Sequence, residues 1–381
     1  MNEMTGACPT DSIQTRKCYS PFFRHFIFFL VLPFFALPKV FANPPSAVFG
    51  FYGEGLILSD GSSDAELIGN LELAGFLNWR HAVSSGGYIF LNASASLNNY
   101  LDDVAVFNDG ETLHLEAGLP LSGAIRLTGS VGSNSSFLGT TNAPPFLRPD
   151  WSAEMLFGDE NQTVRPFLSY EGYYLYQPTD IEDALFQGGL AGLVIQPGIL
   201  TRYRISIGGG WEGWIDYPLY DSSGDDTGEM RNDALIKVQA EADGILGYFG
   251  NYRIKIASDI RFSNSNRYIS SLSHLEGNSE SRVVLTEESN LGWSPKRQLN
   301  LQWGVRARQD LYFAREALDQ NGSLTGETLN ILFFGGSFQI DYTPNDRLYF
   351  VVGTYGGFSL SNDPGEKDWS FVIRTGIEFS L

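Results

Sequence analysis

Apolar and polar residues alternate with a period of two over long stretches of the chain beyond residue 42. Between 248 and 263, for example, tyrosine, isoleucine and phenylalanine share one face, whereas Arg253, Lys255, Asp259 and Arg261 share the other. Successive side chains of a β-strand point to opposite faces, so this alternation predicts strands with one apolar and one polar face. Beyond the first 42 residues, no apolar run approaches the roughly 20 residues of a membrane-spanning helix.

Sixteen such stretches are separated by clusters of glycine, proline, aspartate, asparagine and serine, which favour turns. We therefore predict an all-β fold, a transmembrane antiparallel up-and-down β-barrel of about 16 strands, with roughly 14 to 18 as the range. The predicted strands cover 48–58, 65–80, 88–98, 112–121, 123–132, 151–158, 163–176, 185–196, 201–213, 233–244, 248–262, 281–293, 297–313, 328–342, 347–358 and 369–381.

The linkers between these stretches alternate in length, with short ones such as 159–162 and 294–296. Short periplasmic turns and long extracellular loops are typical of outer-membrane barrels. A soluble β-sandwich is the alternative, but its strands run about five or six residues, shorter than these stretches. The linker 133–150 is a candidate to fold into the lumen, or else to cover its mouth. The long linkers are 99–111, 133–150, 214–232, 263–280, 314–327 and 359–368.

The start of the chain has the order of a secretory signal peptide, with three basic residues before the apolar run 26–42. The run ends in the small residue Ala42, as a cleavage site does. We therefore predict a signal peptide over 1–42 and a transmembrane β-barrel over 43–381. A membrane anchor helix is the alternative, but the run is short and contains two prolines.

The chain is acidic, with a net charge of −19 at pH 7. The predicted leader holds four basic and two acidic residues, so the rest of the chain carries −21. This charge excludes a basic nucleic-acid-binding protein. Both cysteines, Cys8 and Cys18, lie in the leader, so we expect neither a disulfide nor a thiolate metal site in the mature chain. No motif in the sequence predicts a cofactor.

The last stretch, WSFVIRTGIEFSL over 369–381, places apolar and aromatic residues on one face up to the end of the chain. Here the sequence resembles the bacterial outer-membrane β-barrel proteins, and its pattern is porin-like without the signature of one family. The resemblance implies that this terminal strand is bound by the barrel-assembly machinery. In that class the last residue is usually phenylalanine, whereas this chain has Leu381, with Phe379 two residues before it.

A membrane explains both faces of such strands. Every backbone amide must be paired in hydrocarbon, so a β structure there closes on itself, with apolar side chains toward lipid and polar ones toward water. Aromatic residues at strand ends suit the two interfacial girdles of such a barrel, although they could instead pack a core. The candidates are Trp79, Tyr88, Trp151, Tyr176, Tyr203, Trp211, Tyr248, Trp293, Tyr312, Tyr342 and Trp369.

With the polar face turned inward, the lumen carries charges of both signs. Acids outnumber bases in the first eight strands and bases outnumber acids in the last eight, which predicts a field across the lumen. The alternative is a set of ion pairs that rigidify the wall. The candidate lumen-lining residues are Glu66, Glu72, Glu116, Arg126, Glu154, Arg165, Glu171, Arg202, Arg204, Lys237, Glu241, Arg253, Lys255, Arg261, Arg306, Arg308 and Arg374.

Acidic residues are frequent in the predicted outer loops and should raise the local concentration of cations at the mouth. The sequence DSSGDD over 221–226 could hold a calcium ion, although a solvated acidic loop is the alternative.

Three functions fit this pattern to different degrees. The first is passive diffusion of small hydrophilic solutes through an outer-membrane channel with a modest cation preference. The second is a surface-exposed binding or adhesion barrel that does not conduct. The third is an outer-membrane hydrolase, which we do not expect because His81, His114 and His274 lack the context of a catalytic site. Outer-membrane lipid is the expected partner, assembly into a homo-oligomer is an open alternative, and no cofactor is expected.

Overall fold

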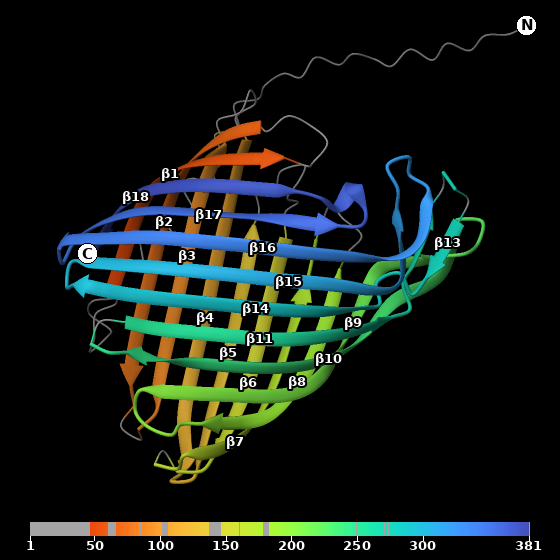
Figure 1. Cartoon of the computed structure of the whole chain (residues 1–381). Coiled ribbons are helices and arrows are strands. Elements are labelled where there is room, and N and C mark those ends of the chain that lie inside the picture. The colour runs from red at the N-terminus through yellow and green to blue at the C-terminus, as the bar shows by residue number, and fades with distance from the viewer. Residues whose placement is uncertain are drawn as a thin grey trace, which may run out of the picture. The chain divides into compact units, whose positions relative to one another are not determined.

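The computed structural model describes residues 46–380, apart from 60–65, 84–85, 101–105, 137–145, 178–182 and the single positions 160, 249, 270 and 273. The predicted signal peptide lies outside these residues. Within them, sixteen antiparallel strands close into one barrel in which every strand pairs with its neighbours along the chain (Figure 1). The predicted all-β class, antiparallel order and strand number are confirmed.

The barrel strands are β1 (Ser46–Ser59), β2 (Glu66–Ala82), β3 (Tyr88–Tyr100), β4 (Val106–Ser122), β5 (Ile125–Ser136), β6 (Phe146–Phe157), β7 (Val164–Leu175), β8 (Ala184–Ile195), β9 (Thr201–Tyr220), β10 (Asp226–Leu246), β11 (Gly250–Ser263), β14 (Arg282–Lys296), β15 (Leu299–Leu318), β16 (Leu324–Asn345), β17 (Leu348–Ser361) and β18 (Trp369–Ser380). A small separate hairpin is formed by β12 (Asn266–Ile269) and β13 (His274–Gly277), and η2 (Pro364–Glu366) is one turn of 3-10 helix.

The barrel closes where its first strand meets its last. β1 and β18 pair antiparallel from Val48 opposite Ser380 to Ser59 opposite Trp369. Each barrel strand therefore has two hydrogen-bonded neighbours, and closure leaves no unpaired strand edge along the wall. The terminal run that the sequence singled out is thus the strand that completes the sheet.

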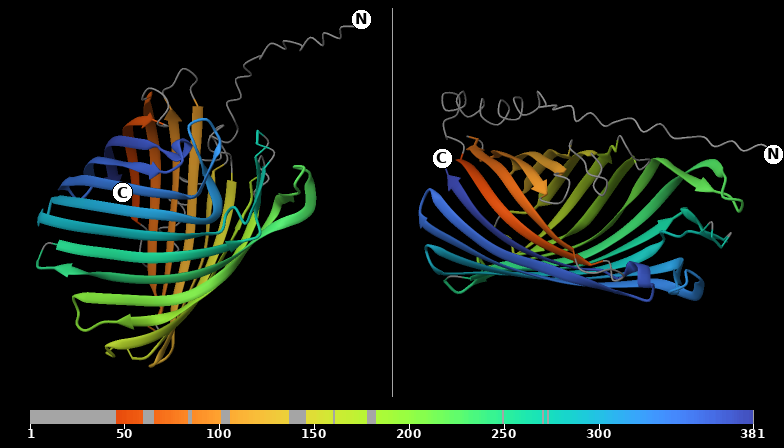
Figure 2. Two further views of the ribbon diagram at one scale, coloured as in Figure 1. Left: turned by 45° about the vertical axis from the view of Figure 1, so that its right-hand side comes forward. Right: turned by 90° about the horizontal axis from the view of Figure 1, so that it is seen from above.

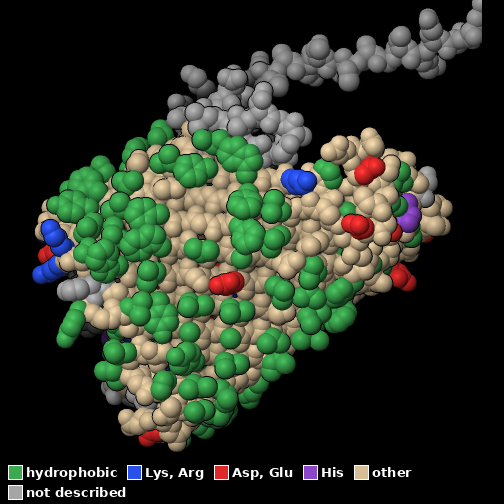
Figure 3. Space-filling view, viewed as in Figure 1, with side chains coloured by type: hydrophobic (Ala, Val, Ile, Leu, Met, Phe, Trp, Pro, Cys, Tyr) green, Lys and Arg blue, Asp and Glu red, His purple; other side chains and the backbone are tan. Residues whose placement is uncertain are grey.

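Apolar side chains cover the outer face of the wall. On β18, Phe371, Ile373 and Ile377 are 37%, 50% and 39% exposed, whereas Val372 on the other face is 2% exposed. Figure 3 shows hydrophobic side chains spread over the visible face, with charged ones mostly near its edges. A continuous apolar surface of this kind marks contact with lipid or protein. Among the described residues, no helix is long and apolar enough to cross a membrane.

The outer hairpins are taller than the sequence predicted. The linkers 214–232 and 314–327, expected as loops, are mostly strand and leave only 221–225 and 319–323 as tips. The tall β9–β10 and β15–β16 hairpins stand out in both views of Figure 2. The error has a physical reason, because outside a membrane neither face needs apolar side chains and the period-two contrast fades.

Other predicted linkers change in the same direction. Strand β4 starts within 99–111, and 263–280 contains the β12–β13 hairpin. The linker 133–150, expected to fold inward or cover the mouth, supplies the ends of β5 and β6, and its remainder over 137–145 lies outside the described residues.

Each of these two tips begins a nine-residue segment, 221–229 or 319–327, and the two segments share the pattern D-x-x-G-x-x-T-G-E, which the sequence analysis missed. In the second tip, one Asp319 oxygen accepts the backbone N–H groups of Asn321 at 2.8 Å and Ser323 at 2.9 Å. These donors, Ser323 first, lower the pKa of Asp319. The fourth residue is glycine with φ of +84° or +75°, which other residues rarely adopt.

The first aspartate of the 221–229 tip closes its turn in the same way, accepting N–H groups at 2.7 Å and 3.0 Å. In the part of the chain that the structure describes, no three His, Cys, Asp or Glu side chains are placed to hold a metal ion. The structure therefore gives Asp221 a turn-forming role in this acidic tip.

Two aromatic residues predicted for the girdles lie on the inner face instead. Tyr88 donates its hydroxyl proton to Glu116, and Tyr312 is 6% exposed beside Arg282. Tyr88 shares the phase of Asn92, which stands opposite the inward His114, and Tyr312 shares the phase of the inward Arg308 and Asp310 on its own strand. Position at a strand end was the reason for the prediction, but the phase along the strand decides which face a side chain takes.

Candidate functional site

The register places all seventeen candidate lumen-lining residues on one face, opposite the exposed apolar side chains. On β10 and β11, for example, Glu241 stands opposite Lys255, and both are flanked by outward isoleucine, valine or alanine. Glu66 has the same phase as Glu72 on β2, but its side chain lies outside the described ones. Strict alternation around a closed wall is what assembles these residues on the inside.

Most of these residues form ion pairs along the inner wall. Neighbouring strands supply the partners in most cases, because residues opposite each other in the register are close. The pairs are Arg202–Asp243 at 2.9 Å, Arg253–Glu241 at 2.7 Å, Arg306–Glu288 at 3.4 Å, Arg308–Asp310 at 2.7 Å, Arg374–Glu54 at 3.5 Å and Arg374–Glu72 at 2.8 Å.

Two further pairs span three strand spacings. Arg204 on β9 lies 2.5 Å from Glu154 on β6, and Lys237 on β10 lies 2.9 Å from Glu171 on β7. Such contacts require inward side chains that converge on the concave side of the wall, and glycines on β8 and β9 leave room for them. Acids of the first eight strands thus neutralise bases of the last eight, which reduces any field across the lumen.

The remaining candidates have other surroundings. Glu116 accepts a hydrogen bond from a tyrosine hydroxyl, and Arg165 donates one to Gln196 at 3.2 Å. In the register, Arg126 stands opposite Pro120 of β4 and Leu156 of β6. Lys255 forms no ion pair within the described residues, since the two glutamates opposite it each bind an arginine.

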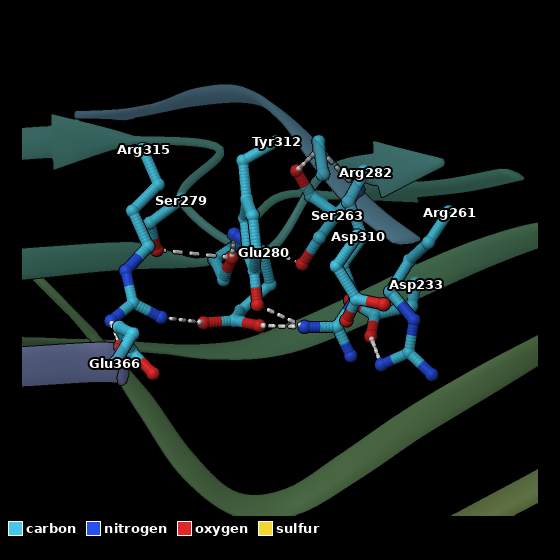
Figure 4. A network of polar contacts seen from close by, with 12 residues as sticks. Asp233, Arg261, Ser263, Ser279, Glu280, Arg282, Asp310, Tyr312, Arg315 and Glu366 are labelled. Atoms are coloured by element: carbon cyan, nitrogen blue, oxygen red, sulfur yellow. Dashed lines mark hydrogen bonds and ion pairs between the residues drawn. The ribbon is translucent and has the colours of Figure 1, made fainter. Parts of the chain in front are cut away.

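A buried charge network joins strands β9, β10 and β11 of the barrel wall (Figure 4). Asp233 is fully buried and accepts hydrogen bonds from Arg231 Nη2 and Arg261 Nη1, both at 2.8 Å. Arg261 also lies 3.1 Å from Glu212, which is 3% exposed. Two carboxylates and two guanidinium groups therefore neutralise one another where water is largely excluded.

A second group of charges continues the network over β14, β15 and η2 (Figure 4). Asp310 accepts two hydrogen bonds of 2.7 Å from Arg308, and Arg282 lies 3.9 Å away. Arg315 binds Glu366 at 2.6 Å, which ties the β15–β16 hairpin to the loop before β18. These contacts tie the β15–β16 hairpin to β14 and to the loop before β18.

Sequence reasoning missed Arg231 and Arg315 because both fall in stretches predicted as loops. A usable signal was nevertheless present. Arg231 and Asp233, like Arg308 and Asp310, are two residues apart, and this spacing puts both side chains on the same face of a strand. Such a pair predicts a local bidentate contact wherever the strand continues.

None of the known protein-family models matches the chain, and no curated protein matches it in sequence. Among solved structures, OccAB1 of Acinetobacter baumannii is similar with a TM-score of 0.52 at 8% identity, over 90% of this chain and 98% of that one. OccAB3 of Acinetobacter baumannii gives 0.46 at 8% identity, over 88% and 99%. CdiB of Acinetobacter baumannii gives 0.43 at 12% identity, over 88% of this chain, which spans about 60% of CdiB.

The likeness to OccAB1 concerns the fold, since the two sequences share so few residues. At that level it agrees with the closed barrel of Figure 1, and the predicted resemblance of the fold to outer-membrane β-barrels is confirmed.

Proposed function

We propose that this chain forms a channel in the bacterial outer membrane through which small hydrophilic solutes diffuse. The observation that carries the proposal is the division of the closed sixteen-strand wall into an apolar outer face and a polar inner one. A barrel of about 16 strands is wider than its own side chains can fill, so water occupies the rest of the lumen. Solutes that replace this water can then pass without a chemical step.

The same proposal places the apolar outer face in lipid and assigns no catalytic role to the chain. Assembly would proceed through β18, the strand that closes the barrel and that the assembly machinery is expected to bind. His114, the inward histidine, lies 3.7 Å from Glu116 and has no serine partner among the described hydrogen bonds. A hydrolase would need a nucleophile within hydrogen-bonding reach of its base.

Planar-bilayer recording tests the channel directly. We expect stable conductance steps, and in a KCl gradient a reversal potential that indicates a modest preference for cations. The reason is the acidic outer rim, where Asp225, Asp226 and Glu229 are exposed. Screening shortens the reach of such charges, so the preference should shrink as the salt concentration rises from about 0.1 M to 1 M.

A triple variant, Asp225→Asn with Asp226→Asn and Glu229→Gln, should keep the conductance and lose part of the cation preference. An anion-selective wild-type channel would contradict the role given to the acidic rim. Electrical silence of a correctly folded barrel would contradict the channel itself and favour the surface-exposed binding barrel instead.

A further inference from the structure

Several inward aromatic rings lie flat against glycines and are covered by a cation. A Cβ atom on Gly192 would come within 2.7 Å of the Phe167 ring, so the ring occupies the space that a side chain would take. The guanidinium carbon of Arg204 lies 3.7 Å from the centroid of that ring, on its lumen side. Similar covered rings are Tyr52 under Arg374, Tyr88 under Arg80 and Phe186 under Lys237.

Phe333 on β16 has the same glycine support without a cover. A Cβ atom on Gly335 or Gly357 would lie 2.9 Å or 2.6 Å from its ring, so the ring rests on these two residues. No lysine or arginine of the described chain lies over it. Arg308, which stands opposite Phe333 in the register, is turned away by its two hydrogen bonds to Asp310. One face of this ring is therefore open toward the lumen.

Two hollows of the inner wall meet beside the open ring. The hollow that includes Phe333 has a volume of about 380 Å³, and the one next to it has about 360 Å³. Asn290, Ser337 and Tyr355 line both, so together the hollows form one groove over β14 to β17. Tyr355 is 49% exposed in this groove and adds a second aromatic ring to its lining.

The far part of the groove is lined by carboxamides held in fixed positions. Asp341 accepts hydrogen bonds from Asn300 at 3.0 Å, Gln302 at 3.1 Å and Gln339 at 2.7 Å. These bonds use an N–H of each amide. Within the described structure, the carbonyl oxygens of Gln302 and Gln339 accept no hydrogen bond from the protein, so they remain available to a hydroxyl donor.

Charged side chains along the groove are already engaged with one another. Arg306 lies 3.4 Å from Glu288, and Arg374 is held by two glutamates of β1 and β2. A charged solute would have to compete with these pairs. A neutral solute with hydroxyl groups and an apolar face finds unoccupied acceptors and an open ring instead.

We propose that this groove binds a neutral carbohydrate. In an oligosaccharide, the C–H face of one sugar ring would stack on Phe333, while hydroxyl groups of the next rings would hydrogen-bond to Ser337 and to the carboxamides farther along β15 and β16. The proposal rests on the proposed channel, since the sugar would reach the groove from the lumen. It makes neutral sugars the class of solute that binds to the wall while it passes through the channel.

Calorimetric titration of the folded full-length mature barrel in detergent, with maltotriose as the probe, tests the site without requiring conductance. We expect saturable binding that weakens about tenfold in Phe333→Ala and is kept in Phe333→Tyr. Gln302→Ala should weaken binding as well, through loss of a hydrogen bond. Phe186→Ala is the matched control, because it removes an inward ring that Lys237 covers, and it should bind maltotriose as the wild type does.

Current recordings with the same probe separate this proposal from the channel proposal. Both proposals are supported if maltotriose blocks the conductance of the wild type and blocks that of Phe333→Ala about tenfold less well. Conductance without maltotriose binding overturns the carbohydrate site and leaves the channel standing. Binding that depends on Phe333 in a silent barrel supports the site and overturns the channel. Equal binding of a carboxylated sugar of the same size would refute the neutral class.

Discussion

Replacing Asp233 with alanine lowers the free energy of unfolding by about 3–5 kcal/mol. The carboxylate is fully buried and accepts hydrogen bonds from the guanidinium groups of Arg231 and Arg261. Its removal leaves Arg261 with Glu212 as its remaining carboxylate partner and takes from Arg231 its hydrogen-bonded carboxylate, in a place where water reaches them poorly. Urea unfolding in lipid vesicles, followed by tryptophan fluorescence, measures the loss.

Asp346→Ala is the control for this variant. Asp346 lies 3.9 Å from Arg297 in a turn, and both side chains are more than nine-tenths exposed. Solvent screens such a pair, so its removal should leave the unfolding curve unchanged. Equal stability of the Asp233→Ala and Asp346→Ala proteins would mean that the outer network contributes no more than a surface ion pair.

The membrane part of the fold could be predicted from the sequence because lipid enforces a strict rule. One face must be apolar and the other is free to be polar, so strands such as β11 and β15 carry a period-two signal along their length. The same rule fixed the face of Arg253 and Arg306 without knowledge of any neighbour. Local alternation was sufficient, since the face depends only on phase.

The partners of these residues could not be predicted, because they depend on the curvature of the closed wall. Nothing local in the sequence indicates that Arg204 meets Glu154 across three strand spacings. The open ring of Phe333 depends likewise on an arginine of β15 that is held elsewhere. Such features combine residues far apart in the chain, and single-sequence patterns carry information only about neighbours.

Glu287 on β14 departs from the rule that makes the fold predictable. Its phase places it on the outer face, opposite Ile256 on β11 and Ala307 on β15. It lines an outer groove with Val238 and Ala240, and no ion pair to it occurs among the described residues. Outward aromatic residues lie farther along the neighbouring strands in both directions, so this carboxyl group stands within the apolar belt. A charge facing lipid destabilises a barrel in a depth-dependent way.

We therefore expect Glu287→Leu to raise the free energy of unfolding in lipid vesicles by about 2 kcal/mol, through loss of the lipid-facing charge and gain of an apolar contact. Glu288→Leu is the matched control on the next residue, which faces the lumen and pairs with Arg306. That change should lower stability, by less than about 1 kcal/mol, because the pair is partly exposed. Opposite signs at adjacent positions are the energetic consequence of a wall with lipid on one side and water on the other. Destabilisation by both substitutions would show that Glu287 meets water or a partner rather than lipid.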